Sequence, residues 1–115
     1  MDLETGVVIE ITSAEQYHQL VTNSESNKLV LVQFTASFCN PCKKFKPKLD
    51  QLAKDNSADV TFVSVNVEEL EKVLVKECEE IIMFPTYKFF KNGKEFLQMR
   101  GLDELTLRLN ILKFK

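Results

Sequence analysis

The sequence lacks a strong charge of either sign. Its 15 lysine and arginine residues nearly balance 17 aspartate and glutamate residues, so the formal net charge of the 115-residue chain is −2 at pH 7. A nucleic-acid backbone would find no basic field to hold it. Long apolar runs are missing as well, and no segment is long enough for a signal-peptide core or a membrane span. We therefore expect a cytoplasmic protein that binds neither nucleic acid nor a membrane.

Internal repeats, linkers and glycine-rich nucleotide fingerprints are also absent. The chain is 44% hydrophobic, which at this length supports one core, so we expect a single domain over residues 1–115. No bound cofactor is expected, because the chain has no nucleotide-binding loop. Three cysteines do not make an even disulfide framework, and the cytoplasm keeps structural thiols reduced. Their chemistry is then redox, metal binding or none.

The first 80 residues alternate between two hydrophobic patterns. β-Branched and apolar runs predict strands over residues 6–11, 29–34 and 60–67. Helical spacing predicts helices after Ser13, from Pro41 to Asn56 with a kink at Pro47, and over residues 68–80. This β-α-β-α order predicts parallel pairing through crossover helices.

The last 30 residues predict antiparallel pairing and a helix. Strand-like residues 86–90 and 95–100 flank Asn92-Gly93, the strongest short hairpin signal. Asp103 can cap a final helix after Gly101, with a buried stripe of Leu105, Leu109 and Leu112. The fold class is therefore α/β with a mixed sheet.

The segment Cys39-Asn40-Pro41-Cys42 carries the chemistry that the sequence predicts. Two cysteines separated by two residues can close a disulfide when the first lies at a helix start and the second one turn inside. Free backbone N–H groups and the helix dipole would stabilise a thiolate on Cys39, which makes it the exposed nucleophile. Cys42, buried further in, would resolve the mixed disulfide. A zinc site is the alternative, but only Cys78 and His18 could complete its four ligands.

The chain resembles the thioredoxin family over nearly all of its 115 residues. The resemblance rests on the segment from Phe34 to Lys43, and on Pro47, Phe84-Pro85-Thr86, Phe90-Lys91-Asn92-Gly93 and Gly101. It implies the thioredoxin fold, a central mixed β-sheet of about five strands flanked by about four helices.

The resemblance also implies a substrate surface beside the dithiol. In thioredoxins the proline matching Pro85 follows a cis peptide bond and leaves the backbone of the preceding residue, here Phe84, free to pair with an extended substrate. Phe38, Pro41, Phe84, Gly101 and Leu102 match the family's apolar contact patch. Without the resemblance, Pro85 would be read only as a turn or strand-start proline.

Four positions depart from the family pattern. Phe38 and Asn40 replace the tryptophan and glycine of the usual Trp-Cys-Gly-Pro-Cys, while the retained Pro41 goes with reducing members. Gln33 stands where most thioredoxins bury an aspartate that helps to move the proton of the second cysteine, and Ser64 stands where a lysine often pairs with it. Glutamine cannot act as a general base. Gln33 is either a site for rate tuning or simply a hydrogen-bonded polar residue in a central strand.

The leading hypothesis is a protein-disulfide reductase that acts on disulfide-containing protein substrates as a monomer. The resemblance implies that a thioredoxin reductase, drawing on NADPH, restores the dithiol. The alternative is a non-catalytic interaction or chaperone module with the same fold. Pro41 disfavours a third hypothesis, a disulfide oxidant or isomerase.

Several reactive or charged residues are given plainer interpretations. Cys78 continues the apolar stripe of Leu70 and Leu74, which favours a buried structural thiol over a regulatory one. His18 is expected to be a surface or packing residue. Four lysines follow the dithiol and are either a solvated helix face or a feature that favours acidic substrates: Lys43, Lys44, Lys46 and Lys48.

Overall fold

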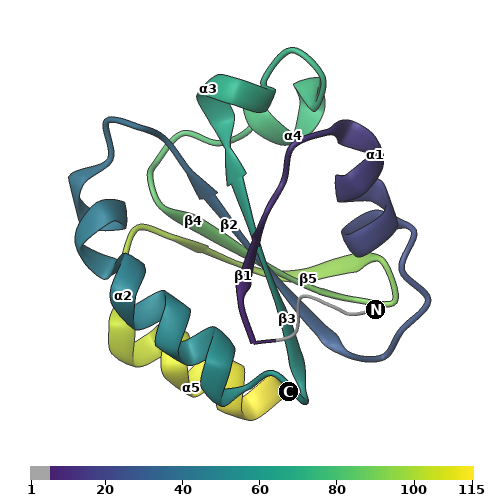
Figure 1. Ribbon diagram of the computed structural model, residues 1–115, viewed down its shortest axis with the longest axis vertical. Coiled ribbons are helices and arrows are strands. Elements are labelled where there is room, and N and C mark those ends of the chain that lie inside the picture. The colour runs from purple at the N-terminus through teal and green to yellow at the C-terminus, as the bar shows by residue number, and fades with distance from the viewer. Residues whose placement is uncertain (1–5) are drawn as a thin grey trace.

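A five-stranded mixed sheet forms the centre of the computed structural model, which describes residues 6–115. Its strands are β1 (Val8–Glu10), β2 (Leu29–Thr35), β3 (Val60–Asn66), β4 (Thr86–Lys91) and β5 (Lys94–Arg100). They lie in the order β1-β3-β2-β4-β5, and β3 is parallel to both β1 and β2. β4 is antiparallel to β2 and to β5 (Figure 1). The predicted mixed sheet is confirmed.

Helices cover both faces of this sheet. They are α1 (Ala14–Tyr17), a π-helical turn η1 (His18–Thr22), α2 (Asn40–Asp55), α3 (Val67–Leu70), α4 (Val75–Glu79) and α5 (Glu104–Phe114). Figure 1 shows α2 and α5 side by side, away from α1, α3 and α4. The helices in the described residues outnumber the four expected, because the region after β3 forms two short helices.

Alternation along β2 divides the interior into two hydrophobic cores. Val30, Val32 and Phe34 point to the core under α1, α3 and α4, whereas Leu29 and Leu31 point to the core under α2 and α5. Since successive strand residues face opposite sides, Gln33 lies on the α2 side of the sheet. This alternation brings a central-strand side chain beneath the start of α2.

The β4–β5 hairpin forms at the predicted Asn-Gly turn. Asn92 and Gly93 have φ values of 52° and 77°, the left-handed region that such a turn requires. A Cβ atom on Gly93 would lie 2.3 Å from the carbonyl oxygen of Thr22. Glycine is therefore needed at position 93 both for the turn and for the close approach of the chain at Thr22 and Ser24.

The single helix predicted over residues 68–80 is wrong. α3 ends at Leu70, and Leu74 adopts φ −115° and ψ 62°, outside the helical region, before α4 begins at Val75. The β-branched Val73 and Val75 flank this break, and such residues lose χ1 freedom in a helix. The break still leaves Leu70, Leu74 and Cys78 buried in one core, as their spacing predicted.

The buried stripe predicted for the last helix is also wrong. Leu105, Leu109 and Leu112 of α5 are each more than half exposed, whereas Leu107 and Ile111 are fully buried. Both sets recur at helical spacing, so periodicity alone did not fix which side of the helix faces the sheet. Leu107 and Ile111 pack in the core that contains Tyr87 and Phe89.

The remaining boundaries follow the sequence closely. β1 is shorter than residues 6–11, and the Ser13 hydroxyl caps α1 by accepting the Gln16 backbone N–H at 3.1 Å. Within residues 6–115, no helix is long and apolar enough to cross a membrane. Residues 1–5 lie outside the described part, so a single domain over 1–115 stays a prediction.

Candidate active site

Cys39 and Cys42 are joined by a disulfide at the start of α2. Cys39 is the N-cap residue, Pro41 lies in the first turn, and the two Cα atoms are 5.3 Å apart. The Cys42 backbone N–H donates to the Cys39 sulfur at 3.2 Å. First-turn N–H groups have no partner within the helix, so a sulfur at the N-cap position can take one of them. The same N–H and the helix dipole would stabilise a Cys39 thiolate after reduction.

The predicted difference in exposure between the two cysteines is not present in this oxidised form. Cys39 is 4% exposed and Cys42 is 6% exposed, so the expectation of an exposed Cys39 is wrong here, while that of a buried Cys42 is confirmed. In the disulfide each sulfur covers part of the other, and the Cys42 backbone N–H, which donates to the Cys39 sulfur, covers that sulfur further.

Exposed apolar side chains surround the dithiol. Phe38 is 66% exposed, and its ring meets that of Phe84 edge to face with centroids 5.4 Å apart. The Phe84–Pro85 peptide bond is cis, as the resemblance implied, and Pro85 is buried. Among residues 6–115, neither backbone polar group of Phe84 has a hydrogen-bond partner. These groups are free to pair with an extended peptide.

Gly101 connects the end of β5 to the cis-proline loop. Its N–H donates to the Pro85 carbonyl at 2.8 Å, and its φ of 80° favours glycine. A Cβ atom at this position would lie 3.1 Å from the Met83 sulfur. Leu102 follows with its side chain exposed, so the predicted patch residues Phe38, Pro41, Phe84, Gly101 and Leu102 all lie at or near the surface at this end of the sheet.

The sequence prediction missed Ile82 and Met83, which add exposed apolar surface next to Phe84. Both directly precede the cis-proline loop, in a segment that has neither strand nor helix. The sequence did contain a signal for this surface, namely two apolar residues in the loop just before Phe84-Pro85.

Gln33 belongs to a chain of three polar side chains, in which Gln33 and Tyr87 are buried and Ser64 is half-buried. The Tyr87 hydroxyl donates to Gln33 Oε1 at 2.8 Å, and Gln33 Nε2 donates to Ser64 Oγ at 3.5 Å. Burial holds the pKa of Tyr87 well above its usual range, so its hydroxyl keeps its proton. Tyr87 was not predicted, although the antiparallel register places it directly opposite Gln33.

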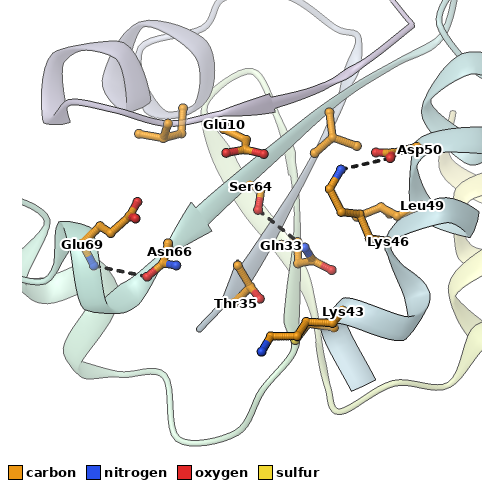
Figure 2. Close-up of a pocket in the computed structure, with 13 residues that line it drawn as sticks. Glu10, Gln33, Thr35, Lys43, Lys46, Leu49, Asp50, Ser64, Asn66 and Glu69 are labelled. Carbon is orange, nitrogen blue, oxygen red and sulfur yellow. Dashed lines mark hydrogen bonds and ion pairs between the residues drawn. The ribbon is translucent and has the colours of Figure 1, made fainter. Parts of the chain in front are cut away.

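A cleft of about 210 Å³ leads to this chain and to Cys42. Figure 2 shows Gln33 and Ser64 joined at its centre, with Glu10, Lys43 and Lys46 around them. Lys46 is paired with Asp50 at 3.0 Å. Cys42 therefore lies at an open cleft lined by both polar and apolar side chains rather than in a sealed apolar core.

The other candidate residues lie outside this arrangement. Cys78 is buried, and burial together with the carboxylates of Glu77 and Glu71 raises its pKa to about 11, which fits a structural thiol. His18 contacts Thr22 through Nδ1 at 2.7 Å and packs against Tyr17, as expected of a packing residue. The four lysines that follow the dithiol are all exposed: Lys43, Lys44, Lys46 and Lys48. Within residues 6–115, no three histidine, cysteine or acidic side chains gather as a metal site.

The chain is similar in sequence and in fold to known thioredoxins. The family model described as Thioredoxin matches residues 7–112. The chain is 41% identical over 90 residues to a thioredoxin from Geodia cydonium, covering 77% of this chain and 82% of that protein. It is 33% identical to thioredoxin domain-containing protein 2 from Rattus norvegicus, covering 98% of this chain but only 20% of that longer protein. The solved structure of Fasciola hepatica thioredoxin has a TM-score of 0.82 at 31% identity, covering 94% of this chain and all of the other.

Proposed function

The chain belongs to the thioredoxin family of thiol-disulfide oxidoreductases, and we propose that it reduces disulfide bonds in other proteins with Cys39 as the nucleophile and Cys42 as the resolving thiol. The disulfide at the first turn of α2 carries this proposal. The bond joins Cys39 and Cys42, which are three positions apart in the sequence. Both lie at a helix N-terminus, where a thiolate is stabilised.

The proposed reaction moves two electrons in two thiol exchanges. The Cys39 thiolate attacks one sulfur of the substrate disulfide, which forms a mixed disulfide and releases the other substrate sulfur as a thiolate that takes a proton from water. Cys42 then loses its proton and attacks the Cys39 sulfur. The bond to the substrate breaks, its second thiolate leaves, and the Cys39–Cys42 disulfide remains.

In this scheme the residue at position 33 determines whether a side-chain base is present to take the proton of Cys42. A glutamine amide cannot accept that proton as a base, and the Tyr87 hydroxyl opposite already carries its own. The cleft that is lined by Cys42 and Gln33 gives water a path to the thiol. We therefore infer that the Cys42 proton passes to solvent. We expect the mixed disulfide to be resolved more slowly than it would be with a buried carboxylate at position 33.

The substrate would lie along the surface of Phe38, Pro41, Phe84, Gly101 and Leu102. Support comes from the edge-to-face contact of Phe38 and Phe84 and from the free backbone groups of Phe84, which can pair with an extended strand. The dithiol would be restored by a thioredoxin reductase that takes electrons from NADPH, so that this chain binds no cofactor itself. We propose a monomer that acts in the cytoplasm.

Reduction of insulin by dithiothreitol, followed as turbidity, tests the proposal. The wild type should accelerate precipitation strongly, and Cys39→Ser should return the rate to that of dithiothreitol alone. Equal rates for the two proteins would instead indicate a non-catalytic interaction or chaperone module.

Alkylation of the reduced protein tests the roles of the two thiols separately. Iodoacetamide at neutral pH should label Cys39 first, because the helix N-terminus stabilises its thiolate. Preferential labelling of Cys42 would overturn the assignment. Cys78, with its pKa raised to about 11, should be labelled last.

A further inference from the structure

A groove runs from the dithiol between the N-terminal ends of α2 and α5. Its volume is about 350 Å³, and its lining is largely apolar. The residues that line it are Asn40, Pro41, Lys44, Phe45, Lys48, Leu102 and Glu104, which together define the α2–α5 groove. Asn40 and Pro41 lie between the two cysteines in the sequence, so one end of this groove lies at the start of α2, where Cys39 is the N-cap residue.

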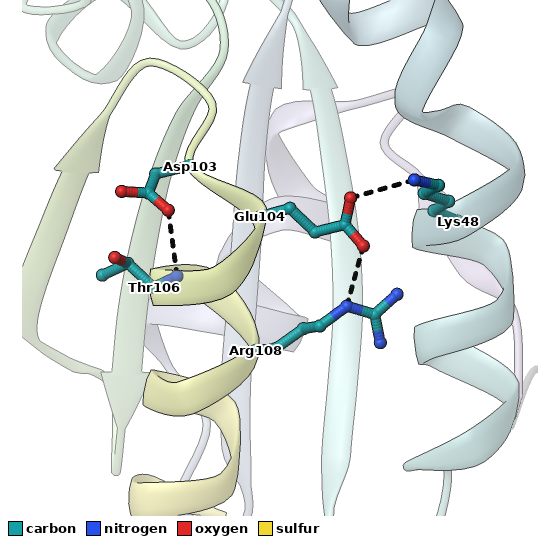
Figure 3. Close-up of polar contacts among 5 residues, drawn as sticks. All are labelled: Lys48, Asp103, Glu104, Thr106 and Arg108. Atoms are coloured by element: carbon teal, nitrogen blue, oxygen red, sulfur yellow. Dashed lines mark hydrogen bonds and ion pairs between the residues drawn. The ribbon is translucent and has the colours of Figure 1, made fainter.

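The rim of the groove carries excess positive charge. Lys44 and Lys48 are one turn apart on α2 and therefore lie on the same side of the helix. Glu104 accepts from Lys48 at 3.1 Å and from Arg108 at 2.9 Å, and these two contacts hold the pKa of its carboxyl below the usual range. Figure 3 shows Glu104 between these two cations. The carboxylate of Glu104 is thus already matched by two positive charges.

Two further observations leave Lys44 as the charge that a ligand would meet. Asp103 turns its carboxylate to the Thr106 backbone N–H at 3.0 Å, on the side of α5 away from Lys48 (Figure 3). Lys44 is exposed and forms no ion pair with any residue in 6–115. An apolar slot with a free cation at its edge complements an apolar side chain that is followed by an acidic one.

We propose that the α2–α5 groove selects protein substrates in which an apolar residue and then an acidic residue lie next to the attacked cysteine. The apolar side chain fills the groove over Phe45 and Leu102, and the carboxylate pairs with Lys44. This rests on the proposed function, because the groove acts only while Cys39 forms its mixed disulfide. It extends the recognition surface from Pro41 and Leu102, which the groove shares with that surface, along α2 to Lys44 and Lys48.

Three peptides, each disulfide-linked to the same small thiol, test the proposal. Their reacting cysteine is followed by leucine and glutamate, by leucine and lysine, or by serine and glutamate. At low salt the wild-type kcat/KM should be highest for the first peptide, by about two- to fivefold over the second, the range of an exposed ion pair. The serine peptide should also be slower than the first, because it leaves the groove empty.

Charge-reversal variants distinguish ion pairing at the groove from the effect of the protein's overall charge on peptide binding. Lys44→Glu should favour the leucine-lysine peptide over the leucine-glutamate one and leave the leucine-to-serine ratio unchanged. Lys54→Glu makes the same charge change at the exposed far end of α2 and should leave all ratios as in the wild type. Equal wild-type rates for the three peptides, or equal effects of the two variants, would overturn the selection. Failure of the proposed function itself would differ, since no peptide would then be reduced faster than with Cys39→Ser.

Discussion

At the scale of single residues, Gln33 is a buried polar side chain at the position where the family resemblance implies an aspartate. Its amide is almost fully buried in the central strand and is held between Tyr87 and Ser64. A buried amide without such partners would cost free energy, so these contacts explain how a polar group is tolerated there. Gln33 is thus a hydrogen-bonded residue of the core, as one interpretation held. It also lies beside the cleft that reaches Cys42, which is the position that the rate-tuning interpretation requires.

Gln33→Asp should speed the resolution of the mixed disulfide. A carboxylate on this strand facing the cleft could take the Cys42 proton, so we expect the single-turnover rate at pH 7 to rise by about tenfold, below the usual contribution of a well-placed base. Because Ser64 offers no charge to pair with, the free energy of unfolding should fall by about 1–3 kcal/mol. Rapid-mixing kinetics and urea unfolding measure the two effects.

Gln33→Asn is the matched control for that variant. It has the same shape as aspartate but cannot accept the proton, so its resolution rate should stay at or below that of the wild type. Equal rates for the aspartate and asparagine variants would show that position 33 does not take part in proton transfer.

Sequence alone predicted the motif residues but not their surroundings. The positions of Cys39 and Pro41 followed from local rules for helix starts, which need no tertiary information. The Tyr87 hydrogen bond to Gln33, by contrast, joins two residues that are distant in the chain. Such contacts follow only once the register of β2 against β4 is known.

At the scale of elements, α5 shows the limit of hydrophobic periodicity. It carries leucines on both of its sides, and the sheet selects Leu107 and Ile111 while Leu105, Leu109 and Leu112 stay exposed. The choice is made by the surface of β4 and β5, which offers Tyr87, Phe89, Leu97 and Met99 to the buried side. The sequence of α5 does not contain this information.

Leu107→Ala and Leu109→Ala form a matched pair that tests the orientation of α5. The first removes a fully buried side chain and should lower the free energy of unfolding by about 2–5 kcal/mol. The second removes a side chain that is 54% exposed and should change it by about 0.5 kcal/mol or less. Urea denaturation gives both values, and a larger loss for Leu109→Ala would mean that the opposite side of the helix is buried.

At the scale of the whole molecule, two cores share one sheet, and each contains ionisable groups. Tyr17 and Cys78 lie in the core under α1, α3 and α4, and Tyr87 lies in the other. The nearly buried Lys88 also extends from β4 to ion pairs with Glu80 and Glu95. The burial of Cys78 was predicted from its spacing, whereas that of Tyr87 and Lys88 in β4 was not, because burial of a polar strand residue depends on which helix covers it.

The buried acids predict a loss of stability at alkaline pH. Burial raises the pKa of Cys78 from its ordinary value of 9.0 to about 11 and raises those of Tyr17 and Tyr87 further. Because the folded pKa values are higher, the unfolded chain releases protons first. The stabilisation is complete below about pH 9 and is lost as the pH rises through 11 and beyond.

Urea unfolding of the oxidised protein should therefore give a constant free energy from pH 7 to 8 and a steady decline above 9. Cys78→Ala should delay the start of the decline, since only the tyrosines, with an ordinary pKa of 10.0, then contribute. A free energy that stays unchanged to pH 11 in the wild type would contradict the burial of these groups.

Trapping of the mixed disulfide tests the central claim most directly. Cys42→Ser leaves Cys39 without its resolving partner, so incubation of this variant with a disulfide-containing protein should yield a covalent adduct. Peptide mapping by mass spectrometry should locate that adduct on Cys39, and the additional change Cys39→Ser should abolish it. Absence of an adduct in Cys42→Ser, or an adduct on Cys78, would contradict the assignment of Cys39 as the attacking thiol.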